Sequence, residues 1–388
     1  MLQAPAAEQA RRGYVDTLRE IVQQPAMWIE TAGRVLASRR QLASLLARAG
    51  IARGRGTILL AGSGSSFHVG ECLASGLRAA FGIPVQPVPS GDFLTHPARS
   101  LPPSGPVLMV SFARSGDSPE SCVALDWTLA HESRVHHLII TCNADGALAT
   151  AHRGDARILR IVLDERTNDR SLVMTSGFTS MVVAGRALAY LDRPRAFTNA
   201  IARLSSMART IMARHSNGLA RAAARRTMAS VHLGTDAHLA AAREASLKML
   251  EMSAGRICSF ADSFLGLRHG PMTAIGKRTL VAAYLSGEAL ARAYELDLCR
   301  EIRRKQPHAF IVLVGENIPP DLVSDETLAV DSAWRYDLCD DEALLLDVLV
   351  GQVLAFFACL ALGLKPDAPS PSGAIRRVVG AFPLHDKG

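Results

Sequence analysis

The chain has 388 residues, of which 48% are hydrophobic and 20% are charged, and its formal net charge is +7. This composition excludes an intrinsically disordered chain, and the length predicts two domains rather than one core. The positive charge predicts attraction to anions, which leaves nucleic acid, an acidic membrane surface and a small phosphorylated substrate open.

The cysteines and the N-terminal segment indicate in which cellular compartment the protein works. The seven cysteines are scattered, without a Cys-x-x-Cys pair. They predict reduced thiols in a cytoplasmic protein, with neither a disulfide framework nor a zinc site. No His, Cys, Asp and Glu cluster has ligand spacing, so we expect no metal. Residues 1–16 lack an apolar run after a basic start, so we expect no signal peptide.

Residues 7–50 have helical spacing, and we expect a break near Pro25 because proline lacks an N–H donor. Short apolar runs then alternate with helical segments. The runs lie at 57–61, 85–88, 107–112, 137–142 and 158–163. Continuous apolar strands separated by helices predict a parallel sheet with helices on both faces.

The alternation resumes after a helical stretch, whose polar part at 193–226 predicts a connector between domains. Residues 231–235 predict a strand end, 236–254 a helix, and 279–285 and 309–314 further strands. The order of strand, glycine, small polar residues and helix occurs in both halves. The repetition of this order predicts a duplicated α/β unit.

Residues 343–364 are apolar enough to cross a bilayer. Asp347 and Gln352 interrupt them, and Asp347, Gly351, Ala355, Cys359 and Gly363 recur along one helical stripe. We expect a core helix packed by neighbours rather than a membrane span.

The sequence GSGSS at 62–66 follows the first strand. Backbone N–H groups, hydroxyls and a helix start then converge at one spot, an arrangement that favours phosphate or sugar contact over a mere connecting turn. Phe67 stands where a dinucleotide fingerprint needs its third glycine, no Gly-Lys-Ser/Thr follows, and the glycine spacing does not match a nucleophile elbow.

The sequence SFARSGDSPES follows another strand and brings Ser111, Arg114, Ser115 and Ser118 to a helix that begins near Pro119. Ser118 is the expected N-cap. A well-capped loop with a solvated Arg114 is the alternative. Two such loops at the carboxyl ends of strands in one sheet favour a shared binding crevice.

Five motifs in order carry a resemblance over nearly the whole chain. They are GSGSS, SFARSGDSPES, TNDRSLVMTSGFTSM (167–181), EASLKMLEMSAG (244–255) and DSFLGLRHGP (262–271). Together they resemble the sugar isomerase (SIS) family, and within it the tagatose-6-phosphate aldose/ketose isomerases and galactosamine-6-phosphate deaminases.

The resemblance implies an α/β fold of two tandem SIS domains, each a five-stranded parallel sheet sandwiched by helices in three flavodoxin-like layers. The expected parts are N-terminal helices at 1–50, SIS domains at 51–195 and 196–375, and a tail at 376–388. It also implies sites shared between subunits, hence a homodimer or homotetramer, and no cofactor.

The resemblance assigns substrate binding to hydroxyl groups and one guanidinium. Ser115 and Ser118 would hold the phosphate with Arg114 beside them, and Ser65 and Ser66 would lie near the sugar. The remaining expected binding residues are Ser111, Thr175 and Ser176. Ala113 stands where many relatives carry Ser, so one hydroxyl contact is missing.

Lys248 and Glu251 lie three apart on one predicted helix, so both side chains can serve one pocket. Without the resemblance, a solvated surface pair is favoured. With it, Glu251 is the base that moves a proton between C1 and C2, and His269 assists ring opening, typically from the neighbouring subunit. A loop-capping role is the alternative for His269.

The expected function is conversion of galactosamine 6-phosphate to tagatose 6-phosphate and ammonia. Simple aldose–ketose isomerisation of a hexose 6-phosphate and a non-catalytic sugar-phosphate sensor are the alternatives. The chain begins Met1-Leu2, without the glutaminase part of the related glucosamine-6-phosphate synthase, which favours degradation over synthesis. Arg221, Arg225 and Arg226 are expected on a solvated helix, so nucleic acid is not an expected partner.

Overall fold

The computed structural model describes residues 1, 4–331, 338–380 and 382–385, so the predicted tail is described except for residues 381 and 386–388. The chain forms two compact units, each assembled from several segments. Unit 1 comprises Met1–Pro25, Arg170–Thr175 and Ala202–Ala374, and unit 2 comprises Ala26–Asp169, Ser176–Ile201 and Ile375–Gly388.

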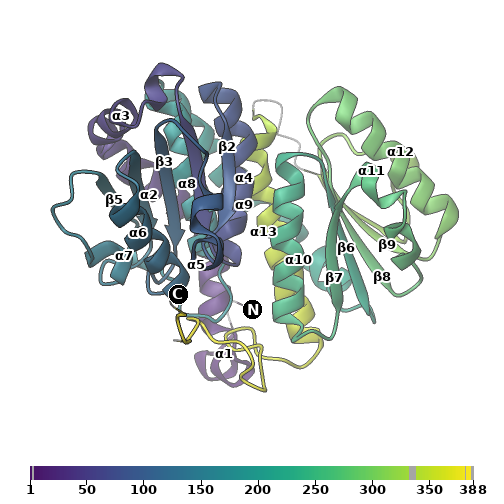
Figure 1. Ribbon diagram of the computed structural model, residues 1–388. Coiled ribbons are helices and arrows are strands. Elements are labelled where there is room, and N and C mark those ends of the chain that lie inside the picture. The colour runs from purple at the N-terminus through teal and green to yellow at the C-terminus, as the bar shows by residue number, and fades with distance from the viewer. Residues whose placement is uncertain (2–3, 332–337, 381, 386–388) are drawn as a thin grey trace. The chain divides into compact units, whose positions relative to one another are not determined.

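Unit 2 holds a five-stranded parallel sheet with the order β2-β1-β3-β4-β5. All five apolar runs of the first half form strands, as predicted. The strands are β1 (Thr57–Gly62), β2 (Val85–Pro89), β3 (Val107–Ala113), β4 (Val135–Thr141) and β5 (Ile158–Val162). Every residue of β1 and β3 is buried, because helices cover both faces of the sheet (Figure 1).

The helices of unit 2 leave the carboxyl ends of these strands or pack on the sheet. They are α3 (Arg39–Arg48), α4 (Ser65–Phe81), α5 (Asp92–Thr95), α6 (Pro119–His131), α7 (Ala147–Thr150) and α8 (Ser176–Arg186). On one face, Leu59, Ala61 and Met109 pack with Phe93 and Ala124. On the other face Leu60 lies against α4 so closely that a side chain at Gly70 would press on it. The sheet core is therefore filled from both sides.

Unit 1 holds the second five-stranded parallel sheet, with the order β10-β9-β8-β6-β7. Its strands are β6 (Ala229–Gly234), β7 (Cys258–Ser263), β8 (Thr279–Tyr284), β9 (Phe310–Gly315) and β10 (Thr327–Asp331). The two sheets with flanking helices confirm the predicted α/β fold class. The sequence identified β6, β8 and β9 but missed β7 and β10, which are the two edge strands and are less fully buried.

The helices of unit 1 include two that it shares with unit 2. The helices are α1 (Ala6–Arg12), α2 (Val15–Ala37), α9 (Pro194–Ala223), α10 (Ala237–Met252), α11 (Phe264–Leu267), α12 (Ala289–Lys305) and α13 (Asp340–Ala361). Helix α2 crosses from unit 1 to unit 2 after Pro25, and α9 crosses from unit 2 to unit 1 after Ile201. The chain therefore passes between the units within continuous helices.

The predicted break at Pro25 is wrong, because α2 continues through it. Proline removes the N–H that would bond to the carbonyl four residues earlier, which is that of Ile21. The side-chain Nε2 of Gln24 donates to the Ile21 carbonyl instead, at 3.1 Å. Ser205 Oγ donates to the carbonyl of Pro25 itself at 2.7 Å. Side chains therefore supply the bonds that let the helix pass the proline.

Helix α13 contains the long apolar segment. Among the described residues it is the one helix long and apolar enough to cross a membrane, and 89% of its most apolar window is buried inside the protein. It lies alongside α10 (Figure 1). Its polar residues are satisfied internally, since Gln352 accepts from Gln24 at 2.8 Å and donates to the Thr175 carbonyl at 3.3 Å. The predicted core helix is confirmed.

We predict that Gly351→Ala lowers the free energy of unfolding by about 1–3 kcal/mol, because the added Cβ would overlap Ala245 Cβ in α10, which has no flexible end to move aside. Urea unfolding followed by circular dichroism measures the change. The control is Gly33→Ala in α2, where the added methyl meets nothing within 4 Å. That variant gains up to about 1 kcal/mol from helix propensity. Equal midpoints for the two variants would contradict the close packing of α10 and α13.

Candidate active site

The first serine loop of unit 2 joins β1 to α4. A side chain at Gly62 would overlap the backbone of Ser66, and Gly64 has φ 55°, so both glycines suit this tight turn. Ser65 begins α4 half-buried, and Ser66 follows it with 8% of its surface exposed. The helix start therefore faces the carboxyl end of the sheet, where its N–H groups favour an anion.

The second serine loop joins β3 to α6. Strand β3 pairs with β1, and Ser111 lies opposite Ala61 near the carboxyl end of both strands. The two serine loops therefore leave neighbouring strands at the same end of one sheet. Ser118 occupies the predicted N-cap position of α6, but its Oγ donates to Ser121 Oγ at 2.8 Å and makes no capping bond. The start of α6 lies at this end of the sheet, because α6 follows the carboxyl end of β3.

A third loop, after β4, supports the second serine loop. Asn143 Nδ2 donates to the Ser115 carbonyl at 2.8 Å, and Asp117 Oδ1 accepts from the Ala147 N–H at 2.9 Å. A side chain at Gly146 would overlap the Ser115 carbonyl. The sequence analysis missed this support, although Asn-x-Asp-Gly after a strand is a turn signal that marks it. These contacts hold Ser115 in place before any ligand arrives.

Arg114 contacts the C-terminal tail rather than solvent alone. Its guanidinium donates to the carbonyl of Arg377. Arg377 in turn donates from Nε to the Asp169 carbonyl at 2.6 Å and from Nη2 to Asn168 Oδ1 at 2.6 Å. The tail and the 167–169 segment thus bring a second guanidinium next to the serine loop. No pattern in the sequence indicated Arg377.

The two remaining predicted binding residues lie on either side of the unit boundary. Ser176 begins α8 in unit 2, is fully buried, and its Oγ has no hydrogen-bond partner within the described part of the chain. A side chain at Gly177 would lie 3.5 Å from Cys142 Sγ, just after β4, so α8 begins at the same end of the sheet as the serine loops. Thr175 belongs to unit 1 and is fully buried there.

A buried cation between two carboxylates lies on α10 in unit 1. Lys248 is fully buried; its Nζ contacts a carboxylate oxygen of Glu251 and lies 3.4 Å from Glu244 Oε1. Burial by itself lowers the pKa of Lys248, but the two carboxylates outweigh it and raise the pKa above its usual value. Lys248 is therefore charged, and the solvated surface pair that the residues alone favoured is not what forms.

The two carboxylates differ in access to solvent. The Glu244 side chain is 0% exposed, while that of Glu251 is 24% exposed. Glu251 can therefore reach a ligand while its position is set by the Lys248 ammonium. Glu244 was missed by the sequence analysis, although its i, i+4 spacing to Lys248 on a helix was available as a signal.

His269 lies in the turn after α11 and is exposed. Within unit 1 it and Glu251 lie at opposite ends of the second sheet. Helix α10 starts after the carboxyl end of β6 and brings Glu251 back toward the amino ends of the strands, whereas β7 returns the chain to the carboxyl end before His269. The six residues of β7 alone span about 20 Å. One chain therefore does not bring this acid and this base together.

The carboxyl end of the second sheet is filled by the protein's own carboxylates. Asp340 accepts from Ser286 Oγ and from the Gly287 N–H at 2.8 Å, and lies 3.2 Å from His238 Nε2. Glu295 accepts from the Ser286 N–H at 2.8 Å. These donors follow β8, the strand that corresponds in sheet order to β3. In unit 1 these carboxylates therefore occupy the position where an external anion would bind.

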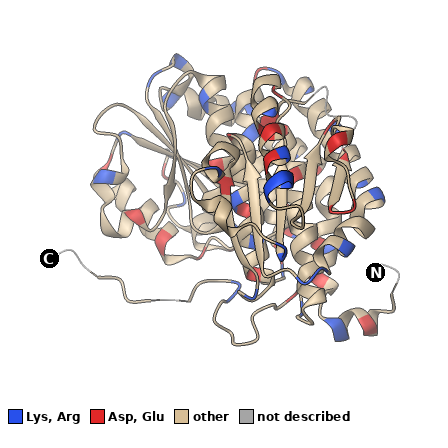
Figure 2. Cartoon of the chain, turned by 90° about the vertical axis from the view of Figure 1, so that its right-hand side faces the viewer, with Lys and Arg blue, Asp and Glu red and all other residues tan. Residues whose placement is uncertain are grey.

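The basic residues at 221–226 do not all lie on a helix. Helix α9 ends at Ala223, so Arg225 and Arg226 lie in the connection to β6, not on a helix as predicted. Figure 2 shows Lys and Arg residues interleaved with Asp and Glu across the view.

Over the described ranges, no group of three or more His, Cys, Asp and Glu residues could hold a metal ion.

We predict that Asp340 makes unit 1 acid-sensitive. Burial raises the pKa of Asp340, but His238, Ser286 and the Gly287 N–H stabilise its ionised form more strongly and hold the pKa well below its usual range. The resulting stability is present above the unfolded pKa of about 3.9 and is lost as the pH falls below it. Asp340→Asn therefore lowers the free energy of unfolding at pH 6, and the difference from wild type shrinks toward pH 3.

Urea unfolding at a series of pH values measures this difference. The matched control is Asp297→Asn on α12, whose side chain is 63% exposed and pairs with Arg300 at the surface. This control is expected to follow the wild-type pH profile. If the unfolding free energies of wild type and Asp340→Asn differ by the same amount at every pH down to 3, the Asp340 charge does not have this role.

Residues 51–191 match the SIS domain. The chain is 36% identical to a Streptomyces coelicolor protein provisionally named D-galactosamine-6-phosphate deaminase AgaS, over 96% of this chain and 95% of that one. It is 32% identical to D-galactosamine-6-phosphate deaminase AgaS of Escherichia coli, over 95% of each.

A solved Clostridium novyi structure, provisionally named tagatose-6-phosphate ketose/aldose isomerase, superposes with a TM-score of 0.94 at 30% identity, covering 100% of this chain and 99% of that one. The long shared coverage includes both sheets and the segments that carry the candidate residues. The chain therefore belongs to the SIS domain family, in the group that contains the AgaS proteins.

Proposed function

We propose that this chain is a sugar-phosphate deaminase and isomerase that converts galactosamine 6-phosphate to tagatose 6-phosphate and ammonia. The observation that carries the proposal is the arrangement on α10, where a partly exposed Glu251 is held by the fully buried, charged Lys248. The proposed substrate follows from the names of relatives that are 30–36% identical over most of the chain, which are called D-galactosamine-6-phosphate deaminases. We also propose residues 51–195 and 196–375 as the two SIS domains, since each range contains one complete sheet.

The serine loops of unit 2 are proposed to bind the phosphate. Ser115 and Ser118 donate hydroxyl hydrogen bonds to it, Arg114 supplies positive charge, and the starts of α4 and α6 add their N–H groups. Ser65, Ser66, Ser111, Thr175 and Ser176 are proposed to line the sugar side of the site. The supporting observation is that all of these except Thr175 belong to one unit.

The chemistry needs three steps and no redox change. His269 protonates the ring oxygen while the C1 hydroxyl loses its proton, which opens the pyranose to the aldehyde. Glu251 removes the proton from C2 and returns it to C1, while the C1 oxygen gains a proton and the C2 amino group loses one, giving a C2 imine with a hydroxymethyl group at C1. Water then adds to the imine carbon, the C–N bond breaks, and ammonia leaves the C2 ketone. Lys248 positions the Glu251 carboxylate throughout.

Simple isomerisation of a hexose 6-phosphate is the second candidate. It uses the same phosphate contacts and the same C2-to-C1 proton transfer, and the tagatose-6-phosphate ketose/aldose isomerase name of the superposed structure favours it. Release of ammonia separates the two candidates. If no amino-hexose 6-phosphate yields ammonia while a plain hexose 6-phosphate isomerises, the deaminase assignment is wrong.

The compartment and the assembly complete the proposal. The seven cysteines are free thiols, which supports a reducing compartment, and we place the enzyme in the cytoplasm. We propose a homodimer or homotetramer in which His269 of one subunit serves the Glu251 of another. The support is the separation of these residues at opposite ends of the second sheet.

We predict that wild-type protein releases ammonia from galactosamine 6-phosphate and that Glu251→Gln lowers kcat by about 100- to 10,000-fold, because the amide cannot accept the C2 proton. Ammonia release measures turnover, and calorimetric titration with a 6-phosphorylated amino-hexitol measures binding. Binding is expected to persist in the variant. Glu30→Gln, an exposed change on α2, is the control and keeps full turnover. Unchanged turnover in Glu251→Gln would remove this residue from the mechanism.

We predict that two inactive variants restore each other. When Glu251→Gln and His269→Ala subunits are co-expressed, a mixed dimer contains one site with neither change and one site with both. Random pairing then gives roughly a quarter of the wild-type rate, since half of the dimers are mixed and each has one working site. Differently tagged subunits allow the mixed dimers to be purified and assayed. A mixed dimer without activity would show that each chain serves its own His269 and Glu251.

A further inference from the structure

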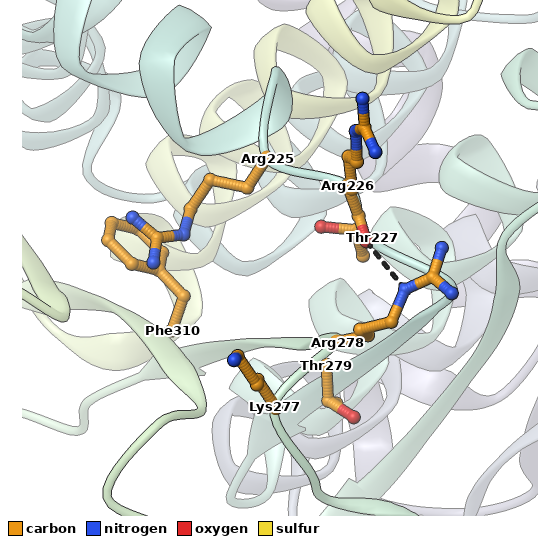
Figure 3. Close-up of a pocket in the computed structure, with 7 residues that line it drawn as sticks. All are labelled: Arg225, Arg226, Thr227, Lys277, Arg278, Thr279 and Phe310. Atoms are coloured by element: carbon orange, nitrogen blue, oxygen red, sulfur yellow. Dashed lines mark hydrogen bonds between the residues drawn. The ribbon is translucent and has the colours of Figure 1, made fainter.

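A cavity with mainly basic lining residues lies in unit 1, at the amino end of the second sheet. Its volume is about 560 Å³. It is lined by Arg225, Arg226, Thr227, Lys277, Arg278, Thr279 and Phe310 (Figure 3). The lining residues come from the connection before β6, the connection before β8 and the first residues of β8 and β9. None of them belongs to the proposed active site.

Four of the seven lining residues are cations, and three of these have no acidic partner. Arg225 pairs with Glu326, but Arg226, Lys277 and Arg278 form no ion pair with any carboxylate in the described part of the chain. Elsewhere in the same unit, Arg268 pairs with Glu301 at 2.9 Å and Arg300 with Asp321 at 2.8 Å. Three uncompensated cations around one space repel each other, and a bound anion would offset that repulsion.

The contacts among the lining residues leave these charges in place. Arg278 Nε donates to the Arg226 carbonyl at 3.2 Å, which ties the two connections together. Figure 3 shows Arg225 and Arg226 on one side of the space and Lys277 and Arg278 on the other. The Arg225 guanidinium lies 4.4 Å from the centre of the Phe310 ring, and its side chain remains 43% exposed. A flat cation supported by an aromatic ring can bind phosphate and stack on a planar group.

We propose that this cavity binds a small anion carrying two or more phosphate groups. Three unpaired cations exceed what the single phosphate of a sugar monophosphate requires, and the volume falls in the range of small-ligand sites. Nucleoside polyphosphates and inorganic polyphosphate share this chemistry. Stacking on Arg225 would favour the nucleoside form. The site lies at the amino ends of the strands of the second sheet, and its lining residues are all different from the candidate active-site residues.

Calorimetric titration of the full-length protein tests the proposal, with a 6-phosphorylated amino-hexitol present at saturation so that the active site is filled. The probes are ATP, inorganic tripolyphosphate, glucose 6-phosphate and a single-stranded RNA oligonucleotide. We expect ATP or tripolyphosphate to bind and glucose 6-phosphate to bind at least tenfold more weakly. Tighter binding of ATP than of tripolyphosphate identifies the nucleoside form, and the reverse order identifies the inorganic form.

The variants Lys277→Glu and Arg278→Glu are each expected to weaken the binding by tenfold or more. Arg304→Glu on α12 changes the net charge equally at an exposed position outside the cavity and is expected to bind as wild type does. Near-UV circular dichroism confirms that each variant is folded. Absence of binding by wild type at millimolar ATP and tripolyphosphate, equal loss in all three variants, or tighter binding of the RNA would each overturn the proposal.

Discussion

Parallel strand pairing is the constraint on which the rest of the structure depends. Because all five strands of a parallel sheet run in one direction, every loop that follows a strand leaves from the same end. In unit 2 this brings the loops after β1, β3 and β4 together, along with the start of α8. Segments between residues 62 and 177 that are far apart in sequence thereby contribute to one surface. The clustered hydroxyls, the helix starts and Arg114 are consequences of that single arrangement, and the C-terminal tail adds Arg377.

The charged residues of α10 illustrate a second constraint, which is that a buried charge must be paired. An ammonium removed from water is costly unless carboxylates lie against it, and Lys248 has two. Glu244 is fully enclosed beside the ammonium, whereas Glu251 keeps part of its surface in solvent. The same ion pairing that permits burial of the cation therefore also fixes a carboxylate at the surface. Stability and the proposed chemistry use one interaction.

Much of this organisation could be predicted from the sequence, and the failures have physical causes. Central strands buried on both faces form continuous apolar runs, so β1, β3, β8 and β9 were identifiable. Strand β7 (CSFADS) contains three polar residues among six, and β10 (TLAVD) has an apolar run of only three residues, so neither was identified. The serine loops were found because glycine and serine follow two strands of one predicted sheet, which favours a shared crevice over two unrelated turns. Arg377, Glu244 and Asn143 were missed because their importance comes from contacts with distant or enclosed partners. The helix through Pro25 depends on a side chain replacing a backbone donor, which no helix-breaking rule anticipates.

The two sheets share a topology but meet the need for negative charge differently. In the first, two helix starts and several serine hydroxyls lie at the carboxyl end of the sheet, where we propose that the phosphate binds. In the second, Asp340 and Glu295 are permanent occupants, joined covalently to the chain that supplies the donors. No external anion is needed to balance these donors, so the stability of unit 1 does not depend on the supply of a phosphorylated ligand.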